Sequence, residues 1–319
     1  KKISDTFIGK FEGKKIDEST IAKTNSQLLK IKPNLIKMNI EQVKKNFNNI
    51  IESLDEPISD TAIISTFLLS KEANKKKLKV LLSGAGGDEL FGGYNRYDDN
   101  KYKFMINLNS EMMINLLIKF INFFPVGKYS RFIFKYFNLG TAYVSSIAGI
   151  DIDVTNKYVK DTKKLAKSIS KINSKFKKMN LNNLRKEFML FDERNYLTDN
   201  ILSLSDQITM YNSVELRLPL LGFTFYKKIK KLSKFNKNSI KKIIYQKFNL
   251  KLVKKKTGFN TPIDKWLDDS FFSNKKKNLN NKTLSNILKL KEIRNKNFLN
   301  KQFIFSLIIL NEWLEKNAK

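Results

Sequence analysis

The residues with the clearest chemical capability lie in one glycine-rich loop. A short apolar run, typical of a strand buried on both faces, comes before three closely spaced glycines: Gly84, Gly86 and Gly87. Asp88 and Glu89 follow, as acids in the first turn of a helix predicted to begin at Gly87 or Asp88. A strand, a glycine loop and a helix N-terminus in this order can bind phosphate, because backbone N–H groups and the helix dipole point toward the anion.

This loop matches neither of the two common nucleotide-binding motifs. A dinucleotide fingerprint would have its third glycine where Glu89 stands, and a P-loop would end in Gly-Lys-Ser/Thr. Carboxylates beside a phosphate repel it unless a divalent cation lies between them, so we expect Asp88 to be a Mg²⁺ ligand. The residues alone leave a second interpretation open, in which the two acids cap a helix and the glycines make only a tight turn.

Composition narrows the available chemistry. The chain has no cysteine and no histidine, which excludes thiolate nucleophiles, disulfides, Cys/His zinc sites and Ser-His-Asp triads. Catalysis would depend on Lys, Asp, Glu, Tyr, Ser, backbone amides and an oxygen-ligated metal such as Mg²⁺. The lack of cysteine is compatible with a reducing cytoplasm, and the chain does not start with a signal peptide, so we expect a cytoplasmic protein.

The charge is strongly basic, with 61 Lys+Arg against 30 Asp+Glu, so nucleic-acid and membrane partners must be considered. Lysine is spread along the whole chain together with much Asn, Ile and Phe, while arginine is scarce, which indicates codon bias more than a binding surface. The most membrane-like run, Met112–Phe124, contains Lys119 and is too short to span a bilayer. We therefore expect neither a nucleic-acid nor a membrane partner.

The elements that must position the loop alternate between strands and helices. Strands are predicted at Asp5–Phe11, Asn34–Ile40 and Lys79–Leu82, and helices from Asp17-Glu18-Ser19 onward, at Glu41–Leu54 and at Thr61–Ala73. This order predicts an α/β fold with a parallel sheet and flanking helices, in which ligands bind beyond the C-terminal ends of the strands. Three acids lie between the last two helices: Asp55, Glu56 and Asp60. Capping of the next helix by Ser59 or Asp60 is the simpler role, and contact with a metal or cationic ligand is the alternative.

After Tyr97 the pattern becomes helical and no further strand is predicted. We therefore divide the chain into an α/β nucleotide-binding part, 1–100, and a helical part of the same domain, 101–319. The expected helices are Tyr102–Phe124, Arg131–Phe137, Thr155–Ile172, Leu181–Leu197, Gly222–Leu232, Ser239–Phe248 and Gln302–Lys316. Asn274–Lys282 is polar and is expected to be a solvated loop.

Two later stretches could take part in a site. Glu215 and Arg217 are separated by one residue, and the arginine could form a bidentate pair with a carboxylate. Lys254–Lys256 precedes a Thr-Gly turn and could neutralise phosphate, although a solvated charge run is the default interpretation in so lysine-rich a chain.

Taken together, these stretches resemble the synthetase domain of the glutamine-hydrolysing asparagine synthetases. Four segments carry the resemblance in order and spacing: Asp-Glu-Pro at Asp55–Pro57, Leu-Ser-Gly-x-Gly-Gly-Asp-Glu-Leu-Phe-Gly-Gly-Tyr at Leu82–Tyr94, Ser-Val-Glu-Leu-Arg-Leu-Pro at Ser213–Pro219, and Lys-x-Gly-Phe-x-x-Pro at Lys256–Pro262. Each motif is weak alone, but the four in order are strong, and the resemblance covers essentially the whole chain.

The resemblance implies an ATP-pyrophosphatase fold of the adenine nucleotide alpha-hydrolase type, and a ligase that adenylates the β-carboxylate of aspartate and then amidates it with ammonia derived from glutamine. It implies that ATP and Mg²⁺ are required and that Asp88 holds the metal on the pyrophosphate. ATP contacts would come from a set of loop residues: Leu82, Ser83, Gly84, Gly86 and Gly87. Lys256 would neutralise the departing pyrophosphate, and Ala85 and Glu89 would line the loop. Glu215 and Arg217 would be scaffold.

Three departures from the family pattern qualify this expectation. The Ser-Gly-Gly-x-Asp-Ser loop of the family's first strand is missing, and so is the N-terminal glutaminase domain, so we expect a chain truncated before Lys1. Ala85 stands where many members have an acid, and Gly222 where an Asp often follows. Aspartate is thus the expected substrate, with another carboxylate (a sugar acid or a β-lactam precursor) and a non-catalytic fragment as alternatives. The oligomeric state, such as a homodimer, is left open.

Overall fold

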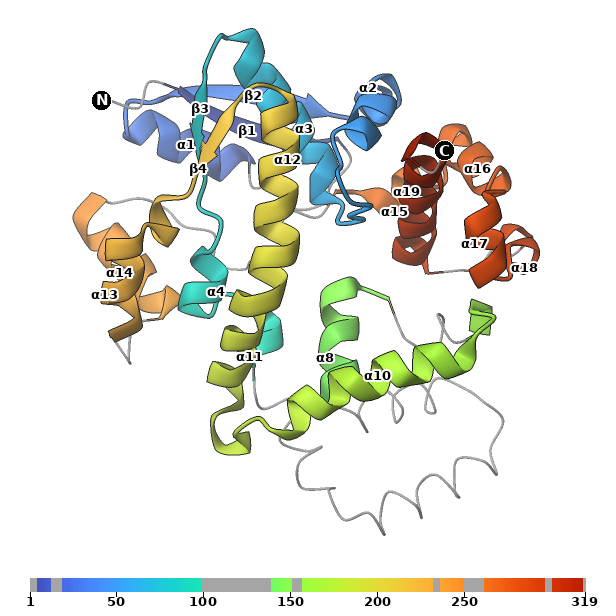
Figure 1. Cartoon of the computed structure of the whole chain (residues 1–319). Helices are drawn as coiled ribbons and strands as arrows, with labels where there is room; N and C mark the ends of the chain where they lie inside the picture. The colour runs from blue at the N-terminus through green and yellow to red at the C-terminus, as the bar shows by residue number, and fades with distance from the viewer. Residues whose placement is uncertain are drawn as a thin grey trace. The chain divides into compact units, whose positions relative to one another are not determined.

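The computed structural model describes residues 5–12, 19–98, 139–150, 157–231, 236–248, 261–295 and 300–317. The chain divides into two compact units, each built from separate segments (Figure 1). The first unit comprises Lys1–Gly93, Asp192–Asn278 and Phe305–Lys319, and the second comprises Tyr94–Phe191 and Leu279–Ile304. In the described part of the chain no helix is long and apolar enough to cross a membrane.

The first unit begins with a parallel strand pair. β1 (Asp5–Phe11) lies beside β2 (Lys32–Met38) in a register that sets Asp5 opposite Lys32, and α1 (Ser19–Leu28) lies between them in sequence. The strand predicted at Asp5–Phe11 is confirmed. The second strand ends two residues earlier than predicted, because Asn39 caps the following helix and its side-chain oxygen accepts a hydrogen bond from Gln42 N at 3.0 Å.

Two helices after β2 contribute buried apolar residues to the core of this unit. α2 (Ile40–Glu52) and α3 (Ala62–Lys75) both appear close to their predicted bounds. Their buried apolar residues recur at helical spacing: Val43, Phe47, Ile50 and Ile51 on α2, and Ile63, Ile64, Phe67 and Leu68 on α3. The capping role expected for Asp60 is confirmed, since its Oδ1 accepts a hydrogen bond from Ala62 N at 2.9 Å.

A second parallel pair joins distant parts of the chain. β3 (Val80–Leu82) pairs with β4 (Glu215–Arg217), and the ladder continues where Ser83 N donates to Arg217 O at 3.0 Å. The expectation that strands stop after Tyr97 was therefore wrong. β4 has only three residues, which is too short to show an alternating pattern. It is a strand because it pairs with β3, and its own sequence does not indicate this. The described strands form two small parallel sheets of two strands each, where one parallel sheet was expected.

A long helical segment leads into β4. The π-helix η3 (Glu193–Leu202) continues directly into α12 (Ser203–Tyr211), which buries Leu204 and Ile208 and contacts α3 and β4. The helix ends at Tyr211. The next residue, Asn212, donates from its side chain to Ser70 Oγ at 3.0 Å, and Ser213 then turns the chain with a φ of +57°. The 3₁₀ turn η4 (Pro219–Leu221), α13 (Phe223–Lys231) and α14 (Lys237–Phe248) follow β4.

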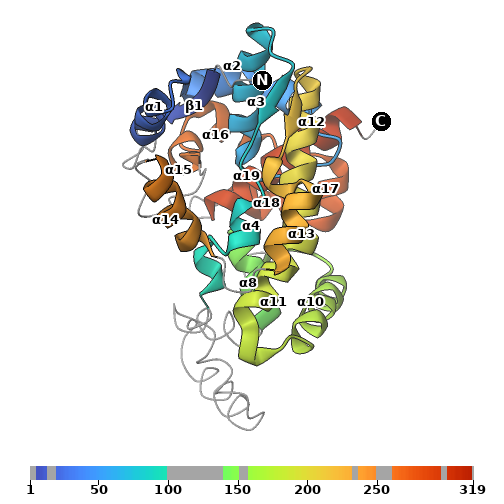
Figure 2. The same cartoon turned by 90° about the vertical axis from the view of Figure 1, so that its left-hand side faces the viewer.

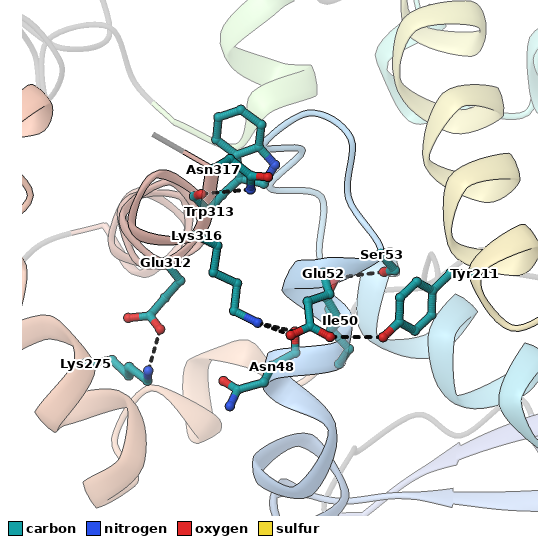
Figure 3. Close-up of polar contacts among 10 residues, drawn as sticks. All are labelled: Asn48, Ile50, Glu52, Ser53, Tyr211, Lys275, Glu312, Trp313, Lys316 and Asn317. Carbon is teal, nitrogen blue, oxygen red and sulfur yellow. Dashed lines mark hydrogen bonds and ion pairs between the residues drawn. The ribbon is translucent and has the colours of Figure 1, made fainter. Parts of the chain in front are cut away.

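The last helices of the first unit fasten the C-terminus to α2. They are α15 (Ile263–Trp266), α16 (Ser270–Lys277) and the end of α19 (Lys301–Asn317). Trp313 Nε1 donates to Leu54 O at 2.9 Å. Lys316 Nζ lies 2.5 Å from Glu52 Oε1 (Figure 3). The loop expected at Asn274–Lys282 was wrong in its first part, because Asp269 caps α16 and the helix runs on to Lys277.

The second unit is helical in its described parts. Its elements are η1 (Asn95–Tyr97), α8 (Leu139–Ala148), α10 (Thr162–Lys177), η2 (Leu181–Asn183), α11 (Leu184–Asp192, whose last residue belongs to the first unit), α17 (Lys282–Ile287) and α18 (Leu290–Arg294). Its core is aromatic, with Tyr143 stacked on Phe188 at a centroid distance of 4.3 Å. The helices predicted at Tyr102–Phe124 and Arg131–Phe137 lie outside the described residues.

Candidate functional site

The glycine loop has the strand–loop–helix geometry expected for it. β3 ends at Leu82, and α4 (Gly87–Phe91) begins where the acids predicted a helix start. Between them the turn is tight, since Gly87 N donates to Gly84 O at 3.2 Å and Ala85 N donates to Ser83 Oγ at 3.2 Å. Because α4 has only five residues, its dipole is small and the loop backbone is the stronger feature for an anion.

The glycines of the loop differ in what surrounds them. Gly86 has a φ of +84°, and a Cβ there would lie 2.5 Å from the Leu221 side chain, so backbone conformation and packing both require glycine. Gly84 has neither constraint: its φ lies outside the left-handed region, and no described heavy atom lies within 4 Å of a Cβ built on it. Among the described residues, the space that a Cβ at Gly84 would occupy is therefore open.

Asp88 is held in place by two contacts from outside α4. Its Oδ1 lies against Gly93, where a Cβ would be only 1.8 Å away, and the same oxygen forms an ion pair with Lys237 Nζ of α14. The carboxylate is mostly shielded, with 16% of the side chain exposed. No sequence signal identified Lys237, because it is 149 positions away in a chain full of lysines.

The rest of α4 faces inward. Glu89, which was expected to line the loop, is 1% exposed, so its carboxylate is shielded from solvent. Phe91 lies edge-on to Phe225 of α13, with ring centroids 6.5 Å apart. Figures 1 and 2 show α4 beside α13 and α14, and α4 also contacts η3. These helices fix the position of the glycine loop.

The π-helix η3 links the loop region to the acidic stretch at residues 55–60. Asp60 Oδ2 accepts hydrogen bonds from Tyr196 OH at 3.3 Å and from Asn200 Nδ2 at 2.9 Å, both on η3. Asp55 N donates to Gln207 Oε1 of α12 at 3.1 Å, while the side chains of Asp55 and Glu56 are exposed. π-helical segments often occur at functional sites, and η3 contacts two of the sequence segments singled out for chemistry.

Another carboxylate of η3 is bound by α13. Glu193 accepts hydrogen bonds from Tyr226 OH and Lys230 Nζ. The hydrogen bond to Glu193, together with burial, raises the pKa of Tyr226 to about 12. Tyr226 therefore stays protonated at neutral pH and acts as a donor, not as a base.

The remaining predicted residues lie at the edge of this region or beyond the described parts. Arg217 forms the predicted bidentate pair with Glu215, through Nε to Oε1 at 2.8 Å and Nη2 to Oε2 at 3.1 Å, and the pair lowers the pKa of the Glu215 carboxyl. Both side chains are well exposed on β4. Lys256 lies outside the described residues, so its predicted role stays a prediction.

At the glycine loop, Asp88 is the one carboxylate that we consider as a ligand for Mg²⁺. The described residues contain no group of three or more acidic side chains that could hold a metal. Mg²⁺ usually binds through one or two carboxylates with substrate phosphates and water, so Asp88 is a sufficient protein ligand if phosphate supplies the others. The donor set therefore fits a metal that arrives with a nucleotide.

Comparison with known proteins agrees with these features. A family model described as asparagine synthase matches residues 2–314. The chain is 25% identical to asparagine synthetase 1, glutamine-hydrolyzing, of Bacillus subtilis (strain 168), over 95% of this chain and 48% of the relative. It is 34% identical to a putative glutamine-hydrolyzing asparagine synthetase of Mycobacterium tuberculosis (strain ATCC 25618 / H37Rv), over 29% of this chain and 14% of the relative. Amidase chry2 of Gibberella zeae is 29% identical over 27% of this chain and 13% of its own length. The chain thus spans less than half the length of these relatives.

Proposed function

The chain belongs to the asparagine synthase family, and from this premise we propose that its glycine loop binds ATP to activate a carboxylate for amide formation. A carboxylate oxygen of the substrate attacks the α-phosphorus, and the bond to pyrophosphate breaks. Ammonia then attacks the acyl carbon of the adenylate, AMP leaves with the C–O bond electrons, and the nitrogen loses a proton. The β-carboxylate of aspartate is the substrate we propose, which makes asparagine the product.

The observation that carries this proposal is the open space at Gly84. Packing against Leu221 and Leu220 accounts for glycine at Gly86 and Gly87, but no described atom accounts for it at Gly84. A nucleotide lying along Leu82–Gly87 would use that space and the adjoining backbone amides. Phosphate transfer depends mainly on positioning and charge neutralisation, which such a loop can provide.

Asp88 would hold Mg²⁺, which when bound supplies the positive charge that neutralises the leaving pyrophosphate. Gly93 and Lys237 orient the carboxylate before the ligand arrives. Lys237 would compete with a metal for Asp88, and if it were released from Oδ1 its ammonium would be available to phosphate oxygens. Lys256 would add a further positive charge.

The nitrogen source and the acceptor are separate parts of the proposal. Two relatives have names that include glutamine hydrolysis, so we propose that the ammonia is derived from glutamine. Ala85 removes a carboxylate from the loop, and one relative is named an amidase, which favours testing other carboxylates besides aspartate.

The test is ATP–pyrophosphate exchange by the intact protein with aspartate. Asp88→Asn keeps the shape of the side chain and removes its charge, so we expect exchange to fall by about a hundredfold or more. Glu41→Gln on α2 is the matched control for loss of one carboxylate, because its side chain is exposed away from the loop, and it should retain exchange. Exchange by Asp88→Asn within about twofold of the parent would remove Asp88 from the site.

A further inference from the structure

A cavity in the first unit is lined by residues outside the glycine loop. It has a volume of about 370 Å³, is open to solvent, and is lined by β2, α2 and α3, which are neighbours in Figure 1. Sites for small organic molecules usually have volumes of about 300 to 1,000 Å³, so this cavity is large enough for a compact metabolite. None of its lining residues belongs to the segments assigned to ATP or to the carboxylate substrate.

The cavity wall is strongly positive. Four lysines line it against a single glutamate, a formal balance of +3: Lys37, Lys45, Lys71, Lys75 and Glu72. Glu72 is already paired with Lys75, its neighbour on α3. Within the described part of the chain, no ion pair joins any of the other three lysines to a carboxylate, so the positive charge of the cavity is not balanced internally.

Lys71 provides a positive charge that the fold holds in a fixed position at the cavity wall. Its ammonium is half-buried and donates to Asn46 Oδ1, while Asn46 itself is 2% exposed. Asn46 Nδ2 donates to Gln42 O at 2.7 Å, which orients the amide so that its oxygen faces the lysine. Lys71 Nζ also lies 5.8 Å from the centre of the Phe67 ring. Both partners are neutral, so they hold the ammonium in position without cancelling its charge.

A half-buried positive charge attracts an anion more strongly than an exposed one, because less water screens it. The apolar part of the wall comes from Leu35, Ile36 and Leu68, of which Leu68 is buried and Leu35 is exposed. We propose that this cavity binds a small metabolite that carries two or more negative charges on a compact carbon body, either a phosphate ester or a polycarboxylate. The ligand's oxyanions would contact Lys71 and Lys45, and its carbon body would lie against the leucines.

The experiment is isothermal titration of the intact protein with citrate and, separately, with glucose 6-phosphate at physiological salt. We expect at least one probe to bind with a dissociation constant below about 1 mM. Lys71→Gln should weaken that binding by about tenfold, and Lys71→Arg should retain it. Lys167→Gln removes one exposed lysine from α10 of the second unit and is the charge-matched control.

The binding results distinguish a ligand held in this cavity from one held elsewhere on the protein. Binding of citrate alone identifies a polycarboxylate ligand, and binding of glucose 6-phosphate alone identifies a phosphate ester. Binding that persists in Asp88→Asn supports a site distinct from the glycine loop. No binding of either probe, or equal weakening by Lys71→Gln and Lys167→Gln, would overturn the proposal. Lys45→Gln gives a second test if Lys71→Gln unfolds, and unchanged affinity in it would also overturn the proposal.

Discussion

Replacing Gly84 by alanine tests whether the open side of the glycine loop serves a ligand. A Cβ at this position meets no described atom within 4 Å, and the backbone is not left-handed. Alanine should therefore leave the fold intact, and it should raise the free energy of unfolding by about 0.4 to 1 kcal/mol, since it restricts the unfolded chain. If ATP occupies that space, the added methyl group obstructs it, and exchange of pyrophosphate into ATP should fall by about tenfold or more.

Gly86→Ala is the matched control, two positions along the same loop. Its alanine would have to adopt a φ of +84°, with a Cβ 2.5 Å from Leu221. The left-handed conformation alone costs an L-residue about 1 to 2 kcal/mol, so this variant should be destabilised by at least that amount. The two glycine-to-alanine changes are thus expected to have opposite effects on stability.

Urea unfolding and ATP–pyrophosphate exchange on the same preparations give both quantities. A Gly84→Ala protein that is stable but slow in exchange supports the proposal. Two results would contradict it. Exchange at the parental rate would mean that no nucleotide lies above Gly84. Destabilisation as large as that of Gly86→Ala would mean that protein already fills this space.

Three further predictions concern other contacts in the first unit. Trp313→Phe removes the hydrogen bond to Leu54 O that fastens α19, so urea unfolding should show a loss of about 1 kcal/mol. Lys316 and then Tyr211 lower the pKa of the Glu52 carboxyl below its ordinary value of 4.5, so the stability from these contacts is present above that value and is lost as the pH falls through the lower folded-state pKa. Glu52→Gln should consequently show a smaller loss of stability on acidification than the parent, measured by unfolding at stepwise lower pH. Asp60→Ala should destabilise α3 by about 0.5 to 2 kcal/mol, whereas Asp60→Asn, which keeps the oxygen that caps Ala62, should lose less in the same assay.

The sequence patterns correctly predicted those features of the structure that depend on residues close together in the chain. The strand at Asp5–Phe11 and the helix starting at Gly87 follow from alternation and from glycine and acid placement, and the structure has both. The cap at Asp60 and the bidentate pair of Arg217 with Glu215 are short-range contacts as well. Each of these features depends on neighbours within a few residues, so sequence reasoning could find them.

Long-range features could not be predicted in this way. β4 is three residues long and becomes a strand only because the edge of β3 is available to it. Lys237 reaches Asp88 from a distant helix, and Glu89 is buried by packing that its own sequence does not show. The π-helical form of η3 has no pattern in the sequence that we can identify. These are the features that decide how the loop region is assembled.

The central claim is that the glycine loop after β3 binds a magnesium-bearing nucleotide. The most direct measurement is a structure of the intact protein with ATP and Mg²⁺. We expect phosphate density against the backbone of Ser83 and Gly84, with the metal on Asp88 and Lys237 displaced from Oδ1. A nucleotide bound elsewhere, with the loop empty and the Asp88–Lys237 pair unchanged, would contradict the account.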